Sequence, residues 1–198
     1  MSLLTLSRQL GSEGDWIAHE VARELGLCYM DHQIVNRAAR EARVPEVALA
    51  HLDELGFLGL RPSPQAHRAY LNRVESILLE LAERGNIVIV GCGGQIVLRH
   101  HPLAVHVQIV APVDLRVTRL MAQEHIPEDA AVNRLVASDK RRATYLKENY
   151  GVDWLDPTLY DVIISTRAIT PESAVVALLA LLHGERTAGL NLQAEVKC

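Results

Sequence analysis

The residues at 7–14 have the composition of an anion-binding turn. They read Ser-Arg-Gln-Leu-Gly-Ser-Glu-Gly and lie between an apolar run and the start of a helical pattern. Small residues at a strand–helix turn allow successive backbone N–H groups and the helix N-terminus to face one anion. Glycines also occur in such turns for steric reasons alone, and that alternative stays open. The residues predicted to surround a phosphate are Gly11, Ser12, Glu13, Gly14 and Asp15.

The loop departs from the phosphate-loop pattern GxxxxGK[ST] in its charges. Gly14 stands where the pattern has lysine, and Asp15 stands where it has a hydroxyl residue. The lysine charge is therefore missing, and Asp15 opposes an anion unless a cation intervenes. On this reasoning, a Gly14→Lys substitution tightens phosphate binding. Arg8 flanks the loop and is a candidate for part of the missing charge, although an arginine at a strand end often only reaches solvent.

A second group of candidate residues is basic. Lys140, Arg141, Arg142 and Lys147 lie in one segment of a chain whose net charge is −4. Phosphoryl transfer needs positive charge around the transferred oxygens, and such a segment can supply it by closing over the site. The alternative is a solvated helix face on which acidic neighbours such as Asp139 pair with the cations.

The composition excludes several classes of protein. The 198 residues are 49% hydrophobic and 22% charged, as in a globular protein. Twenty Lys and Arg against 24 Asp and Glu argue against a general nucleic-acid or anionic-membrane surface. The N-terminus lacks the pattern of a signal peptide, and the longest apolar stretch, residues 174–182, is half a membrane span. We therefore expect a cytoplasmic protein with no nucleic-acid or membrane partner.

Neither a disulfide framework nor a metal site is expected from the cysteines and histidines. The three cysteines are odd in number and widely spaced. The histidines at 100, 101 and 106 lack the spacing of a metal-binding pair on a helix.

The elements that must position the candidate residues alternate along the chain. Strands are predicted at 3–6, 27–30, 86–90, 104–110 and 162–164. Helices are predicted at 16–25, 31–42 with Asp31 as N-cap, 45–55, 64–84 after Ser63, 95–100, 113–124, 127–150 and 171–183 after Thr170. Apolar strands separated by helices predict an α/β fold with a doubly wound, five-stranded parallel sheet. We expect one domain over residues 1–184 and a tail at 185–198.

The chain resembles the cytidylate-kinase-like family, a branch of the nucleoside monophosphate kinases, over residues 3–182. The resemblance rests on the loop at 7–14, on Tyr-Met-Asp at 29–31, on Ile-Val-Gly-Cys-Gly-Gly at 89–94 and on the block from 139 to 161. Within that block, Gly-Val-Asp-Trp-Leu-Asp-Pro at 151–157 is the most specific part, because Trp, Pro, Gly and Asp at those intervals rarely arise by composition.

The resemblance implies a P-loop kinase sheet with an acceptor-binding insertion at about 31–84 and a lid at about 127–157. It also implies transfer of the γ-phosphoryl group of ATP, bound with Mg²⁺, to a pyrimidine nucleoside monophosphate. The partners are then a nucleotide donor and a small phosphorylated acceptor, and a homodimer is left open.

The resemblance also assigns residues to roles. Around the donor, it implies Arg8, the loop from Gly11 to Asp15, and Arg119 on the helix after the fourth strand, where a surface position is equally open for Arg116 and Arg119. Asp31 and Arg37 keep the six-residue interval of an acceptor-binding pair. The acceptor side also includes Gly91 and Gly93, and the catalytic lid residues are Asp139, Lys140 and Arg142.

Several departures from the family's pattern around one site leave a second function open. In the loop, Glu13 replaces a glycine that is usual in the family, and Asp15 replaces the family's common arginine. The family usually has arginine after the strand-ending Gly91, where this chain has Cys92, and cytidylate kinases proper have an acidic residue where this chain has Gly93. Each lost phosphate contact costs on the order of 1.5–3 kcal/mol, so several losses together can abolish turnover. The alternative is a catalytically impaired nucleotide-binding or regulatory protein on the same fold.

Overall fold

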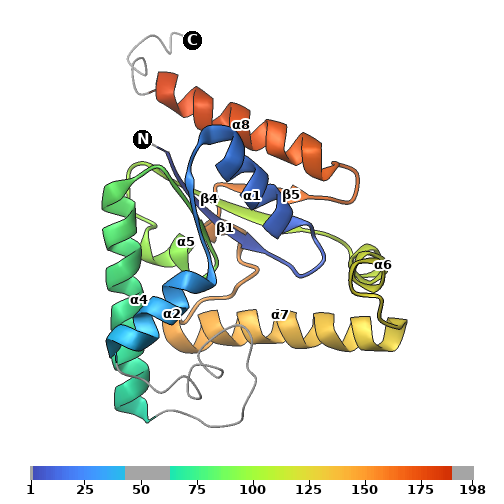
Figure 1. Cartoon of the computed structure of the whole chain (residues 1–198), viewed down its shortest axis with the longest axis horizontal. Coiled ribbons are helices and arrows are strands. Elements are labelled where there is room, and N and C mark those ends of the chain that lie inside the picture. Colours follow the sequence, from blue (N-terminus) through green and yellow to red (C-terminus); the bar gives the residue numbers. More distant parts are fainter. Residues whose placement is uncertain (1, 43–62, 189–198) are drawn as a thin grey trace, which may run out of the picture.

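The sheet at the centre of the molecule consists of five parallel strands (Figure 1). The computed structural model of the chain describes residues 2–42 and 63–188. The strand order is β2-β3-β1-β4-β5. The strands are β1 (Leu3–Arg8), β2 (Cys28–Met30), β3 (Ile87–Val90), β4 (Ala104–Val110) and β5 (Val162–Ser165). All residues of β1 are buried because this strand has neighbours on both edges and helices on both faces.

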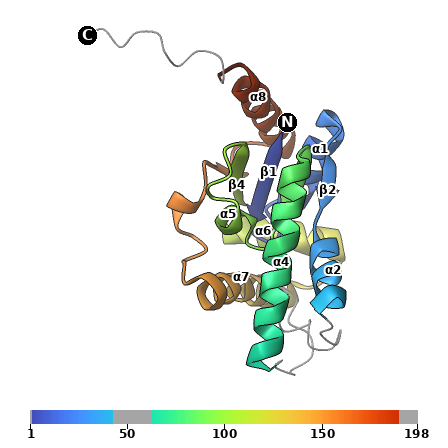
Figure 2. The same ribbon diagram turned by 90° about the vertical axis from the view of Figure 1, so that its left-hand side faces the viewer.

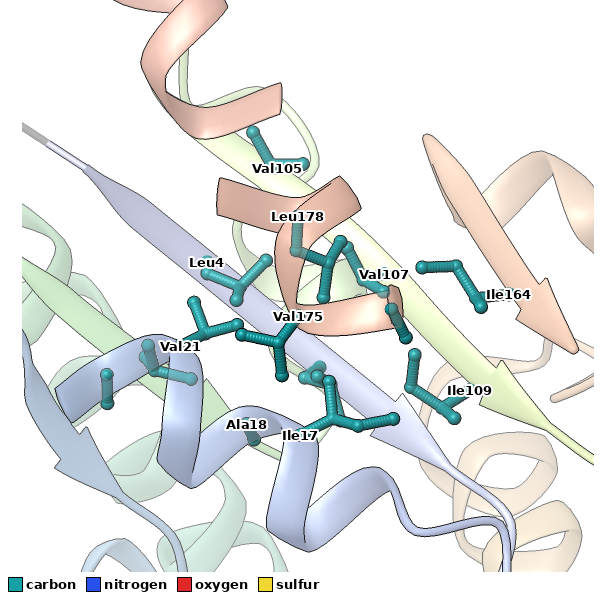
Figure 3. Packing of buried hydrophobic residues seen from close by; sticks show 14 of the residues in the cluster. Leu4, Ile17, Ala18, Val21, Val105, Val107, Ile109, Ile164, Val175 and Leu178 are labelled. Carbon is teal, nitrogen blue, oxygen red and sulfur yellow. The ribbon is translucent and has the colours of Figure 1, made fainter. Parts of the chain in front are cut away.

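Two layers of helices cover the sheet (Figures 1 and 2). The helices that contact the sheet are α1 (Gly14–Leu25), α2 (His32–Ala42), α4 (Pro64–Arg84), α5 (Gly94–Val97) and α8 (Pro171–Ala188). One apolar cluster, which includes Leu4 and Leu6 of β1, joins α1 and α8 to one face. Figure 3 shows Leu4 within this cluster beside Val175 and Leu178 of α8. A second cluster joins α2 and α4 to the other face, where Leu3 points. The alternation along β1 places consecutive residues in different layers.

A further pair of helices lies beyond the carboxyl ends of the strands. These are α6 (Val113–Glu124) and α7 (Glu128–Tyr150), which pack on each other through Val117, Leu120, Ala131 and Leu135. Figure 1 shows α7 crossing the molecule beyond the end of β1. A short 3₁₀ helix, Pro157–Leu159, follows and leads into β5. The helix pair therefore lies where the loops that follow parallel strands converge.

The predicted fold class is confirmed, and most predicted elements occur near their expected bounds. Both β4 and α6 have the predicted limits, and the Ser63 side chain caps α4 by accepting from the Ala66 N–H at 3.2 Å. The predicted C-terminal helix was too short, because α8 continues to Ala188. The helix predicted at 95–100 was too long, because α5 ends at Val97. The helix predicted at 45–55 lies outside the described residues.

A buried histidine joins the two central strands. His106 of β4 is opposite Thr5 of β1, and the Thr5 Oγ1 is 2.7 Å from the His106 Nδ1. The backbone N–H of His106 donates to Asp161 Oδ2 at 2.7 Å. Burial lowers the pKa of the His106 imidazole, although the nearby Asp161 carboxylate acts in the opposite direction. The neutral imidazole is therefore the form that the fold accommodates.

The lowered pKa of His106 predicts acid sensitivity of the fold. In the unfolded chain the His106 imidazole has a pKa of about 6.5 and binds a proton below that pH, whereas the folded chain resists this proton. The free energy of unfolding therefore decreases as the pH is lowered through this range. We expect His106→Gln to lose less stability than the wild type between pH 7.5 and 5.5, measured by urea unfolding. The exposed His100→Gln variant is the control and should keep the wild-type dependence. Equal dependence in His106→Gln and wild type would contradict the assignment.

Candidate active site

Backbone hydrogen bonds and one left-handed residue hold the turn between β1 and α1. The Gln9 N–H donates to the Ile109 carbonyl at 3.0 Å, and the Ser12 N–H donates to the Gln9 carbonyl at 3.1 Å. Glu13, the residue before α1, has φ 66° and ψ 13°. A non-glycine residue in this left-handed region costs about 1–2 kcal/mol, so the surrounding structure must hold it there. Glu13 occupies the position where the phosphate-loop pattern has its second glycine.

Ser12 is a buried polar residue that the protein alone does not satisfy. Its side chain is fully buried, and its Oγ has no hydrogen-bond partner among the described residues. A buried hydroxyl without a partner costs about 1–3 kcal/mol, and a bound oxyanion would provide the missing acceptor. The N-terminus of the twelve-residue helix α1 follows directly, so the loop and helix dipole both favour an anion here.

Arg119 contacts the loop from α6. Its Nη1 donates to the Gly11 carbonyl at 3.3 Å and to Thr166 Oγ1 at 2.9 Å, while its Nη2 donates to the Thr166 carbonyl at 3.1 Å. Thr166 follows β5, and its hydroxyl also donates to the Ser12 carbonyl at 3.0 Å. Arg119 thus lies beside the loop, held by hydrogen bonds to the Gly11 carbonyl and to Thr166.

Arg116 connects the loop to helix α7. Its guanidinium is buried and forms a bidentate pair with Asp139, at 3.1 Å to Oδ1 and 2.9 Å to Oδ2. Its Nη1 also donates to the Leu10 carbonyl at 3.4 Å. A Cβ added at Gly11 would lie 2.8 Å from the Arg116 carbonyl oxygen, so the loop and α6 touch. Sequence reasoning left Arg116 equally open to a surface position, and its buried role follows from the partner on α7.

Arg142 is turned toward the ends of β1 and β3. It is buried, donates to the Ser138 Oγ, and has its Cζ 6.0 Å from the centre of the Trp154 ring. Arg142 lines a small cavity together with Ser7, Gly91 and Gly93. The structure therefore brings Arg142 of α7 together with the end of the central strand and the turn after β3.

Trp154 holds this arrangement in place. Its Nε1 donates to the Ser7 Oγ at 2.8 Å, and its carbonyl accepts from the Tyr160 hydroxyl at 2.8 Å and from Gln108 Nε2 at 3.3 Å. The segment at 151–157, which stood out in the sequence only as a marker of resemblance, is thus anchored to β1 and β4. It forms the wall against which Arg142 packs.

The basic cluster predicted at 140–147 does not form as one surface. Lys140 and Lys147 are exposed, whereas Arg142 is buried. Two residues along an α-helix correspond to about 200° around its axis, so Lys140 and Arg142 must point in nearly opposite directions. The prediction of a single cluster was therefore wrong, and Lys140 is not brought to the site. Asp139 is brought near it, but as the partner of Arg116.

The predicted acceptor side lies at the β2–β3 edge of the site. Met30 pairs with Ile89, so Asp31 and Gly91 lie at neighbouring strand ends. Arg37 faces two carboxylates, with its Nε 2.8 Å from Glu41 Oε1 and its Nη2 2.6 Å from Glu80 Oε2. An incoming phosphate must therefore compete with these carboxylates for Arg37.

A tyrosine at the end of α7 covers the turn after β3. Cys92 in this turn has φ 57°, and Gly93 has φ 70°. A Cβ added at Gly93 would lie 2.9 Å from Tyr150 Cε2. Burial raises the pKa of Tyr150 to about 12, so its hydroxyl stays protonated at neutral pH. The turn at Cys92 and Gly93 thus contacts the uncharged side chain of Tyr150.

Residues 2–42 and 63–188 contain neither a metal-binding cluster nor a helix that could cross a membrane. Within these ranges, no group of three or more His, Cys, Asp or Glu side chains is placed to hold a metal ion. None of the helices described there has both the length and the apolar character needed to cross a bilayer.

The Arg116–Asp139 pair predicts a less stable protein when its carboxylate is removed. Asp139→Asn leaves the buried guanidinium without its charged partner, which should lower the free energy of unfolding by about 1.5–3 kcal/mol. The exposed Glu148→Gln on the same helix is the matched control and should change stability by less than about 0.5 kcal/mol. Urea unfolding of the three proteins measures both effects. Equal stability of the two variants would show that the pair does not hold α7.

Comparisons with known proteins agree with this architecture. The cytidylate kinase of Ignicoccus hospitalis is 26% identical over 183 residues, which cover 92% of this chain and 99% of that protein. A solved structure of an uncharacterized protein from Eubacterium ventriosum has a TM-score of 0.75 at 18% identity, over 92% of this chain and 99% of that chain. Shikimate kinase from Bacteroides thetaiotaomicron has a TM-score of 0.55 at 16% identity, over 92% and 98% of the two chains.

The two solved structures are similar to this chain in fold. The sequence profile of the cytidylate kinase-like family matches residues 3–168. This range includes the loop at 7–14, Arg116 and Arg119 of α6, helix α7 and Trp154. Since this match spans most of its length, the chain belongs to the cytidylate kinase-like family.

Proposed function

We propose that the protein is a nucleotide kinase that transfers the γ-phosphoryl group of Mg-ATP to a nucleoside monophosphate. The observation that carries the proposal is the position of Arg142. This cation comes from helix α7, is buried, and lies between the end of β1 and the turn after β3, where it lines a cavity of only about 10 Å³, about the volume that one water needs. Membership of the family and relatives named cytidylate kinase support the same reaction class.

On the donor side, the proposed ligands of the ATP phosphates are the loop from Gly11 to Gly14, together with Arg8 and Arg119. The loop supplies backbone N–H groups and the Ser12 hydroxyl, which is buried without a partner among the described residues. Arg119 lies against the Gly11 carbonyl and adds positive charge at the rim of the loop. The N–H dipoles of the loop and the two arginines then neutralise the phosphate charge together.

Asp15 is the proposed contact for Mg²⁺. Its carboxylate is 58% exposed at the start of α1, directly after the loop. Magnesium is usually bound by one or two carboxylates together with substrate phosphates and water, so a large protein ligand cluster is not required. When bound with ATP, the ion neutralises charge on the phosphate oxygens. The residues present therefore fit the ion.

The transfer step itself asks for positioning and charge. An oxygen of the acceptor phosphate forms a bond to the γ-phosphorus while the bond to the ADP oxygen breaks. Arg142 stabilises the charge on the transferred oxygens, and the packing of Trp154 beside it keeps water away. On the acceptor side, we assign Asp31, Arg37, Gly91 and Gly93 to binding the monophosphate.

The competing proposal is a nucleotide-binding or regulatory protein without turnover. Cys92 favours it, because this turn then lacks the arginine that the family usually has beside the acceptor phosphate. Tyr150, which covers the same turn, brings no charge to replace it. The two proposals share the donor site and differ in whether an acceptor is phosphorylated.

Turnover separates the two proposals. We expect ADP formation from Mg-ATP with at least one member of a panel of nucleoside monophosphates, and we expect Arg142→Met to reduce kcat on the order of 10²–10³-fold. Arg134→Met, an exposed position on α7, is the control and should retain activity. Thermal stabilisation by ATP without ADP formation would favour the regulatory protein. Neither stabilisation nor ADP formation would contradict both.

A further inference from the structure

We propose that Arg8 is the cation that replaces the phosphate-loop lysine, and that Arg8 and Gly14 form one steric unit in which only one of the two can carry a long side chain. The inference rests on the proposed ATP site and deepens it. In the pattern GxxxxGK[ST], glycine stands at the position of Arg8 and lysine at the position of Gly14. In this chain the glycine and the basic residue have thus changed places, with arginine in place of lysine.

The space around Gly14 explains why the exchange involves both positions. A Cβ added at Gly14 would overlap the Arg8 Cβ, and it would lie 2.9 Å from the Arg8 Cγ and 3.3 Å from the Ile109 Cβ. The stem of Arg8 therefore occupies the volume that any side chain at position 14 needs. A lysine at position 14 requires a residue without a stem at position 8.

The backbone at Gly14 does not itself require glycine. Gly14 begins α1 and is not among the residues with positive φ, whereas Gly11 in the same loop has φ 75°. Glycine is among the poorest helix formers, so its presence at the start of this helix needs another cause. Contact with the Arg8 stem supplies that cause, and the glycine is thus explained by its neighbour across the loop.

The direction of Arg8 places its charge at the loop. The side chain is 7% exposed, and its Nε is 2.8 Å from Asp15 Oδ1 at the start of α1. The guanidinium therefore reaches from the strand end past Gly14 to the first turn of the helix, where the pattern's lysine would begin. Arginine can present several donors to phosphate oxygens, so the exchange retains a cation of suitable chemistry.

The Arg8–Asp15 pair gives the loop two contacts of opposite charge for Mg-ATP. The guanidinium is the contact for a phosphate, and the carboxylate is the contact for the accompanying Mg²⁺. In the structure the two side chains satisfy each other, which limits the cost of holding a buried arginine beside an exposed carboxylate. This arrangement also corrects the expectation that Gly14→Lys alone tightens phosphate binding, because the Arg8 stem stands in its way.

A ligand-free double-mutant cycle tests the steric unit. Gly14→Ala adds only a Cβ and should lower the urea midpoint in the wild-type background. In the Arg8→Gly background the same substitution should cost much less or become stabilising, since the overlapping stem is gone and alanine favours the helix. Equal destabilisation in both backgrounds would overturn the steric part of the proposal.

Binding of Mg-ATP to the full chain, measured by calorimetry, tests the charge. Arg8→Met keeps an apolar stem and removes the cation, and we expect its Kd to rise about 10- to 100-fold. The exchange variant Arg8→Gly/Gly14→Lys should recover most of the affinity that Arg8→Gly loses. An unchanged Kd in Arg8→Met would overturn the assignment of Arg8 while leaving the kinase proposal intact. A wild-type chain that fails to bind Mg-ATP would instead reject the proposed function.

Discussion

The bidentate pair between Arg116 and Asp139 is the interaction on which the geometry of the site depends. It joins α6, which contacts the loop after β1, to α7, which carries Arg142 and ends at Tyr150. The guanidinium is almost fully buried, so its charge requires this partner and tolerates little displacement of α7. Trp154 provides the second attachment, through its hydrogen bond to Ser7. Between these two attachments, Arg142 is held over the end of the central strand.

Ion pairs distribute charge through the site of an acidic chain. The net charge of −4 hides a local arrangement in which Arg8 faces Asp15 and Arg37 faces Glu41 and Glu80. Of the arginines that we assign to phosphates, Arg8, Arg37 and Arg119 are thus already near a carboxylate or a carbonyl oxygen, and Arg142 donates to the Ser138 hydroxyl. A phosphate that enters must exchange with these partners, so affinity reflects a difference between two sets of contacts.

Local signals in the sequence were sufficient for the secondary structure and much of the fold class. Unbroken apolar runs predicted the buried strands. The limits of β4 and α6 agreed with prediction because prolines and polar residues mark these boundaries; Pro112, for example, directly precedes α6. The end of α8 was missed because residues 184–188 have no apolar periodicity, yet the helix continues. The loop at 7–14 could likewise be located from its residues, because a strand, a glycine-containing turn and a helix follow one another directly.

The sequence by itself determined that this chain has a phosphate-loop-like turn without its lysine, a basic segment at 140–147 and the motifs of the cytidylate kinase-like family. Only the tertiary structure decided which basic residue of the 140–147 segment turns inward. Lys140 and Arg142 lie on nearly opposite sides of α7, and only Arg142 is buried. The tertiary structure also decided the role of Gly14, since the conflict with the Arg8 stem arises between residues that come into contact when the loop folds back. Motif spacing records which residue types are present, whereas the direction of each side chain depends on packing across the sheet and the lid.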